Sequence, residues 1–278
     1  MDVVKLFKDA FIYPTKNWTV YLILGVLFAI SGIADAYRSF QINSIIHVDS
    51  IIYNASQTSF SSDILVSTMY GQQMWHADLI YYIFSILAII VFIFISGYAL
   101  NIVRKTLALE EEIPEFEIKL NIIDGLKVLV LSIAYCIIPL IFIIGGIIAK
   151  LSILIFIGAI LLILFSLLLI IATARLAETD NLIEAMNYIN VFNKIGEIGW
   201  ANFVIWIIVF ILAMIGIMIV ISIVTGLLGL LLGMIIALTG ASLSIGVFIF
   251  SILILFLFYP FIQLFSSRAL GLLYNEAK

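Results

Sequence analysis

The densest set of side chains that could do chemistry is an acidic stretch near the middle of the chain. It comprises Glu110, Glu111, Glu112, Glu115, Glu117 and Asp124. Hard cations such as Mg²⁺ prefer carboxylate oxygens, so an enzyme that acts on lipid headgroups could use such a stretch. However, the stretch lacks a spaced aspartate motif with a positioned base, and runs of like charge are usually solvated. We therefore expect neither a catalytic residue nor a metal site there.

The remaining ionisable groups favour catalysis even less. His47 and His76 are far apart in the sequence and lack a third ligand at helical spacing, so they do not predict a zinc site. Asp35 is the only carboxylate inside a predicted span, and its spacing to Arg38 predicts an i,i+3 ion pair. The sequence contains no Gly-rich phosphate loop and no nucleophile elbow. We expect no cofactor and no enzymatic centre.

Two prolines and two amides inside apolar stretches mark where a kink or cavity is expected. Pro139 and Pro260 remove helical hydrogen bonds and are predicted to kink their spans. Asn101 and Gln263 are expected to hydrogen-bond between helices, which contributes about 1 kcal/mol each. The candidate cavity or kink residues are Asn101, Tyr135, Pro139, Tyr259, Pro260 and Gln263.

Composition identifies the solvent in which these groups act. The 278 residues are 65% hydrophobic and 11% charged, whereas soluble domains are about half apolar and about a quarter charged. A water-soluble fold could not bury that much apolar surface, so lipid is the expected surrounding. No basic patch suggests nucleic acid. The single cysteine, Cys136, excludes an intrachain disulfide framework and a Cys-based zinc site.

The apolar stretches predict an all-α polytopic membrane bundle that forms one integral membrane domain over residues 1–278. A bilayer core needs about 20 apolar residues per helix. Six transmembrane helices satisfy this, at about 18–37, 79–103, 128–148, 151–174, 202–225 and 243–266, with an external loop at 38–78. Residues 226–242 are left over, and a helix extension, a re-entrant turn and a seventh span are all open for them.

The basic residues predict the orientation. Of the 13 Lys and Arg residues, only Arg38 and Lys150 fall on one predicted side of the membrane. Because basic residues favour the cytoplasm, we expect both termini there. The tripeptide that begins at Asn54 then lies on the external side and matches a glycosylation acceptor.

The predicted cytoplasmic segments are patterned. Residues 2–13 and 181–199 each carry an apolar stripe at helical spacing, which predicts amphipathic interfacial helices. Residues 113–124 alternate with a period of two, so a helix is poorly supported there, and Pro114 marks the start of the segment.

A repeat is visible around these segments. Each precedes a predicted hairpin of two spans, and the three hairpins end at Arg104, Arg175 and Arg268. Arginine at helix ends is also a general feature of membrane proteins. The pattern therefore fits either three repeated helical-hairpin units or the ordinary occurrence of arginine at the ends of unrelated transmembrane helices.

Three groups of short motifs run from one end of the chain to the other. They are Phe7-Lys-Asp-Ala-Phe-Ile-Tyr-Pro14 with Asn17-Trp18; Ile113-Pro-Glu-Phe116 with Asp124-Gly-Leu-Lys127 and Tyr135-x-x-x-Pro139; and Ser267-Arg268-Ala-Leu-Gly-x-Leu-Tyr274. Together they resemble the uncharacterised archaeal membrane family of methanogens catalogued as domain of unknown function 4013. The chain is also distantly similar to the membrane portion of glycerophosphodiester phosphodiesterases, but their catalytic domain is absent. The resemblance implies an archaeal plasma-membrane protein and supplies no activity.

The scarcity of reactive groups favours a non-enzymatic protein, either a scaffold or an accessory subunit for a membrane partner or lipid. One alternative is a permease or lipid-handling transporter with an apolar cavity, in which the prolines permit motion. A second alternative is a lipid-active membrane enzyme that uses the acidic stretch. Gly229 and Gly233 form a small-xxx-small pair, which could join a second copy or another membrane protein, or pack within the chain.

Overall fold

The computed structural model describes residues 2–46, 76–240 and 242–276, and all regular structure in these ranges is helical. This confirms the predicted all-α class. The elements are α1 (Val3–Ile12), η1 (Tyr13–Thr15), α2 (Trp18–Ser31), α3 (Ile33–Ile46), α6 (Leu79–Leu107), α7 (Ile118–Ala149), α8 (Ser152–Thr179), α9 (Leu182–Met186), α10 (Tyr188–Ile198), α11 (Trp200–Thr239) and α12 (Leu243–Asn275). The predicted glycosylation residue, Asn54, lies outside the described residues.

The chain divides into two compact units. Unit 1 comprises Met1–Tyr21, Ile93–Met214 and Phe261–Lys278, and unit 2 comprises Leu22–Phe92 and Ile215–Pro260. Each unit is built from segments that are distant in the sequence, so each is described on its own.

Five helices in the described part of the chain are long and apolar enough to cross a membrane, namely α6, α7, α8, α11 and α12. They cover five of the six predicted spans. The first predicted span is instead a broken pair, because α2 and α3 are bent by 47° around Gly32. Ser31 Oγ donates to the Phe28 carbonyl at 2.8 Å, a contact that often bends helices. The structure thus holds five spans, or six if this pair crosses as one.

The expectation for residues 113–124 is wrong in part, because α7 begins at Ile118, well before the predicted span. Asn121 and Asp124 are fully buried there, while Ile118 and Ile123 are 70% and 43% exposed. The polar side of this helical segment therefore faces the protein and the apolar side faces outward. This arrangement differs from the inward apolar stripe by which an amphipathic helix is usually recognised.

Residues left over after the fifth predicted span extend a helix. α11 runs without a break for 40 residues to Thr239, so neither a re-entrant turn nor a seventh span interrupts it. Gly240 has a φ of +68° and ends the helix. Within unit 2, a Cβ at Gly246 would overlap the side chain of Ile236, so α12 packs closely on the end of α11.

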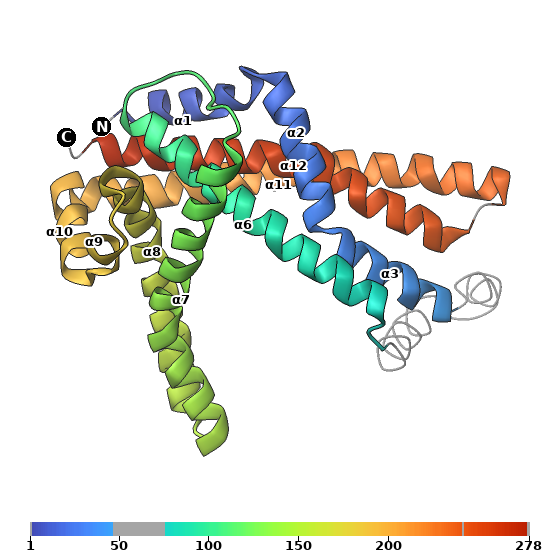
Figure 1. Cartoon of the computed structure of the whole chain (residues 1–278), viewed down its shortest axis with the longest axis horizontal. Helices are drawn as coiled ribbons and strands as arrows, with labels where there is room; N and C mark the ends of the chain where they lie inside the picture. Colours follow the sequence, from blue (N-terminus) through green and yellow to red (C-terminus); the bar gives the residue numbers. More distant parts are fainter. Residues whose placement is uncertain (1, 47–75, 241, 277–278) are drawn as a thin grey trace. The chain divides into compact units, whose positions relative to one another are not determined.

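Within unit 1, α7 and α8 form a long hairpin whose helices lie side by side (Figure 1). Two glycines permit the close approach. A Cβ at Gly146 would lie 2.8 Å from Ile155, and one at Gly158 would lie 2.6 Å from Ile143. Lys150 closes the turn with a φ of +54°. Short α9 and α10 pack against α8.

Unit 2 contains a polar contact at the start of α6. Asp78 accepts from the Tyr81 backbone N–H at 2.8 Å, and its other oxygen accepts from the Tyr37 hydroxyl and the Gln41 amide, each at 2.8 Å. These contacts join α3 to the start of α6. α3 itself continues as a helix to Ile46, into the segment predicted as an external loop.

Candidate functional site

The three arginines noted at the predicted hairpin ends are each paired with a carboxylate in unit 1. Arg104 Nη1 lies 2.8 Å from Asp124, Arg175 Nη2 lies 3.4 Å from Glu184, and Arg268 Nη2 lies 3.0 Å from Asp9. We call these three ion pairs the arginine clamps. In each clamp the carboxylate comes from one of the segments that precede a hairpin.

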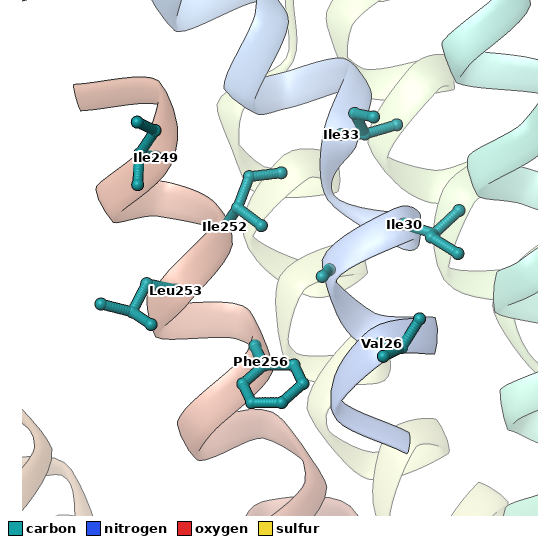
Figure 2. Close-up of a pocket in the computed structure, with 8 residues that line it drawn as sticks. Val26, Ile30, Ile33, Ile249, Ile252, Leu253 and Phe256 are labelled. Atoms are coloured by element: carbon teal, nitrogen blue, oxygen red, sulfur yellow. The ribbon is translucent and has the colours of Figure 1, made fainter. Parts of the chain in front are cut away.

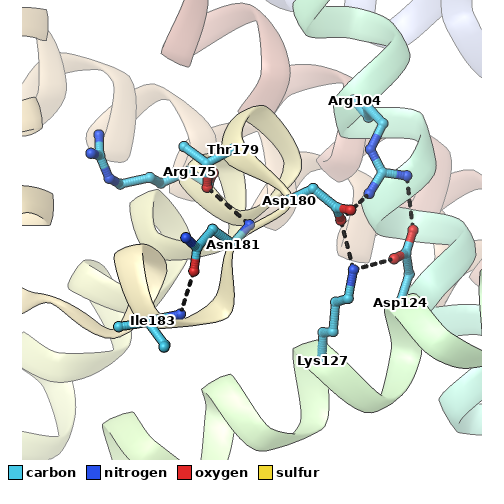
Figure 3. Close-up of polar contacts among 8 residues, drawn as sticks. All are labelled: Arg104, Asp124, Lys127, Arg175, Thr179, Asp180, Asn181 and Ile183. Carbon is cyan, nitrogen blue, oxygen red and sulfur yellow. Dashed lines mark hydrogen bonds and ion pairs between the residues drawn. The ribbon is translucent and has the colours of Figure 1, made fainter.

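The Arg104 clamp is part of a four-charge cluster, shown in Figure 3. The Asp124 side chain is completely buried, and Arg104 Nη2 also reaches Asp180 at 3.2 Å. Lys127 Nζ lies 2.7 Å from Asp180 and 3.5 Å from Asp124. Two cations thus alternate with two carboxylates, which balances the charge. The cluster joins α6, α7 and the residue that ends α8.

The cluster also sets the protonation of its exposed member. A hydrogen bond from Lys127 holds the pKa of Asp180 below its usual range, and attraction to Lys127 and Arg104 adds to this, while partial burial opposes it. Asp180 therefore stays ionised at neutral pH, as the ion pairs require.

Acidification is expected to remove the contribution of Asp180 to stability. Because its folded pKa is lowered, the contribution is present above the ordinary aspartate pKa of about 3.9 and is lost as the pH falls through the folded value. The side chain is 62% exposed, so we expect a loss below about 1 kcal/mol. Thermal unfolding of wild type and Asp180→Asn in detergent should differ at neutral pH and converge in acid. Asparagine tolerates the φ of +53° at this position. A difference independent of pH would contradict the assignment.

Arg268 is the most buried arginine among the clamps, at 3% exposure. Besides Asp9, it donates from Nη1 to the Glu110 carbonyl at 2.7 Å and to Thr106 Oγ1 at 3.3 Å. Its guanidinium lies 4.9 Å from the centre of the Tyr13 ring. Burial raises the pKa of Tyr13, so that hydroxyl stays protonated. This clamp ties α1, the end of α6 and α12 together.

Next to the Arg175 clamp, the end of α12 contacts α8 and α10. The Tyr274 hydroxyl donates to Glu178 at 2.6 Å, and Lys194 Nζ lies 5.1 Å from the centre of the Tyr274 ring. Lys194 also pairs with Glu197 at 2.8 Å. Most cations of unit 1 described so far therefore contribute to contacts between helices.

The acidic stretch does not converge on one point. Glu110 pairs with Lys105 at 2.6 Å, Glu111 pairs with Lys16 at 3.3 Å, and Asp124 belongs to the buried cluster. Within the described ranges, no three metal-binding side chains gather at a possible ion site. The arrangement therefore gives a hard cation no shared set of carboxylates.

Among the predicted cavity or kink residues, Tyr135 has a clear structural role. Its buried hydroxyl donates to the Ala185 carbonyl at 3.0 Å, and its ring packs against Tyr188 with 4.8 Å between centres. Tyr188 in turn donates to the Ala134 carbonyl at 3.0 Å. The pair fastens α9 and α10 to α7. Pro139 lies buried one turn further along α7.

The other predicted residues are divided between the units. In unit 1, Asn101 is buried, and Gln263 donates to Ser267 at 3.1 Å within the same helix. The hydrogen bond of Gln263 thus lies within α12, whereas one to another helix was expected. In unit 2, Pro260 is buried, and Tyr259 is 44% exposed and packs on Phe28. None of the six predicted residues lines the groove described next.

Unit 2 contains an apolar groove of about 340 Å³ between the bent pair α2–α3 and α12. Figure 2 shows the side chains that line it from both sides. They include Val26, Ala29, Ile33, Ile252, Leu253 and Phe256. With only hydrocarbon on its walls, the groove offers a place for an acyl chain and no group that could react with one.

Gly229 and Gly233, predicted to form a small-xxx-small pair, have few close neighbours in the structure. A Cβ at Gly233 would meet nothing within 4 Å, and one at Gly229 would only touch Phe250 at 3.6 Å. The two glycines are thus not used for close helix packing within the described part of unit 2.

Comparison with known proteins identifies a family. A family model described as "Protein of unknown function (DUF4013)" matches residues 80–228, more than half of the chain. No curated protein and no solved structure matches. The matched range contains the whole four-charge cluster around Arg104, whereas Asp9 and Arg268 lie outside it.

Proposed function

Because the chain belongs to the DUF4013 family of proteins of unknown function, we propose its role from the site itself: it is a non-enzymatic membrane scaffold or accessory subunit. The observation that carries this proposal is the set of arginine clamps. Arg104, Arg175 and Arg268 are each paired with a carboxylate and used to join helices. Groups that could otherwise bind or activate a substrate are committed to holding the protein together.

The clamps also support a threefold repeat. Arg104 pairs with Asp124 of the segment after its hairpin, and Arg175 pairs with Glu184 of the next such segment. Arg268, after the last hairpin, pairs with Asp9 of the first segment, which closes the series. We propose three equivalent hairpin units and six spans, the bent pair α2–α3 crossing as one.

The proposed location follows from the basic residues and the resemblance. With an even number of spans both termini lie on one side, and the basic bias makes that side the cytoplasm. The resemblance adds an archaeal plasma membrane as the proposed location. A rigid, clamped set of helices at one membrane face suits a protein that positions a partner.

A second candidate, lipid handling, is favoured by the apolar groove in unit 2. All eight side chains that line it are hydrocarbon, and a groove of about 340 Å³ can hold part of an acyl chain. On this alternative a lipid that occupies the groove is the cargo. On the scaffold proposal, a lipid in the groove is an ordinary bilayer lipid and is not transported.

Filling the groove separates the two candidates. Ala29→Phe places a ring in the groove, while Ile23→Phe, at a 42% exposed position of the same helix outside it, is the matched control. We expect both variants to keep a protein partner at wild-type stoichiometry, measured after extraction in lipid-preserving particles. A several-fold drop in one co-purified lipid together with loss of cellular phenotype, for Ala29→Phe alone, would instead support lipid handling.

A further inference from the structure

α10 has two apolar faces, which the sequence pattern had merged into one stripe. Val191 and Ile195 are buried against unit 1, at 0% and 1% exposure. Ile189 and Phe192 face outward, at 72% and 54% exposure. An amphipathic helix that only completes a bundle needs the first face, and the second face still requires an explanation.

The outward face is larger than α10 itself. Ile183 of α9 is 81% exposed, and Trp200, the first residue of α11, is 47% exposed. The Phe192 and Trp200 rings are in contact, with 4.7 Å between their centres. We call Ile183, Ile189, Phe192 and Trp200 the outer apolar face.

Cations do not contribute to this face. Lys194, the only basic residue of α10, is 9% exposed and is held between Glu197 and the Tyr274 ring. The exposed polar neighbours on α10 are Asn193 and Glu197. Whatever binds the outer apolar face would therefore contact mainly apolar side chains, and polar groups would lie only at the edge.

We propose that the outer apolar face binds lipid and seats α9 and α10 in the interface of the leaflet where α11 begins. The argument for lipid is continuity. Only Gly199 separates α10 from α11, so α10 cannot move away from the bilayer that α11 enters. Exposed Trp200, Val204 and Ile208 continue the apolar surface along α11. Tryptophan prefers the membrane interface, and amphipathic helices there bury aromatic and aliphatic side chains among the headgroups.

The segment before α2 has the same construction. α1 buries Leu6 and Ala10, and it exposes Val4 by 79% and Ile12 by 47%. It too is followed by a span-initiating tryptophan, Trp18, which is 63% exposed. Two independent segments thus present an outward apolar face directly before an interfacial tryptophan. This inference does not depend on the scaffold proposal.

Spin labels can test the proposal in purified protein reconstituted into phosphatidylcholine and phosphatidylglycerol vesicles. In a Cys136→Ala background, single labels are placed at Ile189→Cys and Phe192→Cys, with the exposed polar position Asn193→Cys as the control on the same helix. The measurement is the ratio of the collision rate with oxygen, which enters lipid, to the collision rate with a water-soluble nickel chelate. We expect this ratio to be several-fold higher at positions 189 and 192 than at position 193.

Two outcomes would overturn the proposal. Nickel accessibility at 189 and 192 equal to that at 193 would mean that the face meets water. Low accessibility to both reagents would mean that protein, such as a second copy, covers it. If either substitution impairs folding, as judged by gel filtration, Ile183→Cys provides the same measurement at the most exposed position of the face.

Discussion

Replacing Gly97 with leucine is expected to prevent α6 and α7 from packing. A Cβ at Gly97 would overlap the Asn121 carbonyl oxygen, and one at Gly125 would overlap the Ile93 carbonyl oxygen. These are backbone atoms of facing helices, so no side-chain rotation can relieve the overlap. Close backbone approach through small residues is a principal source of helix association in lipid. Overpacking usually costs about 1–3 kcal/mol, and we expect about 3 kcal/mol or more here.

The matched control for this prediction lies on α7. A Cβ at Gly145 would meet nothing within 4 Å, so Gly145→Leu should be tolerated. Stability is measured by SDS titration of purified protein in mild detergent, and the folded yield by fluorescence-detected gel filtration. If Gly97→Leu were as stable as Gly145→Leu, the α6–α7 crossing described above would be incorrect.

The second large effect is expected for Arg104→Met. This change leaves the fully buried Asp124 carboxylate without its 2.8 Å partner, and only Lys127, at 3.5 Å, remains. Removing one partner of a buried ion pair costs about 3–5 kcal/mol. Because Lys127 remains and Arg104 is 28% exposed, we expect about 3 kcal/mol, measured by the same SDS titration.

Two further variants make this prediction specific. Lys105→Gln changes the adjacent residue, whose pair with Glu110 is 40% and 47% exposed, and should cost less than about 1 kcal/mol. Arg104→Met combined with Asp124→Leu should recover much of the loss, because an apolar pair can replace a buried ion pair. Additive effects of the two single changes would mean that Arg104 and Asp124 are not coupled.

The positions of the spans could largely be predicted because hydrocarbon thickness fixes how long an apolar helix must be. α6 begins at Leu79, where the second span was expected. Hydropathy is unaffected by a bend, so the break at Gly32 could not be seen. The helical turns at residues 118–124 were not expected, because Asn121 and Asp124 face the interior and isoleucines face outward, which reverses the usual pattern of an amphipathic helix.

Only one partner of each arginine clamp could be predicted from the sequence. Arg104, Arg175 and Arg268 stood out at the hairpin ends, but their partners did not. Asp9 and Arg268 are at opposite ends of the chain, and no local pattern connects them. The apolar groove also carries no sequence signal, because its walls are aliphatic side chains within stretches that are apolar throughout.

The most direct test of the scaffold proposal is mass spectrometry of the protein extracted from its own membrane in lipid-preserving particles. We predict a protein partner at fixed stoichiometry, retained in both Ala29→Phe and Ile23→Phe. Through that partner the process served by the chain could be identified. A preparation without a protein partner, enriched in a single lipid or solute that Ala29→Phe removes, would contradict the scaffold proposal and name the cargo of a lipid-handling protein.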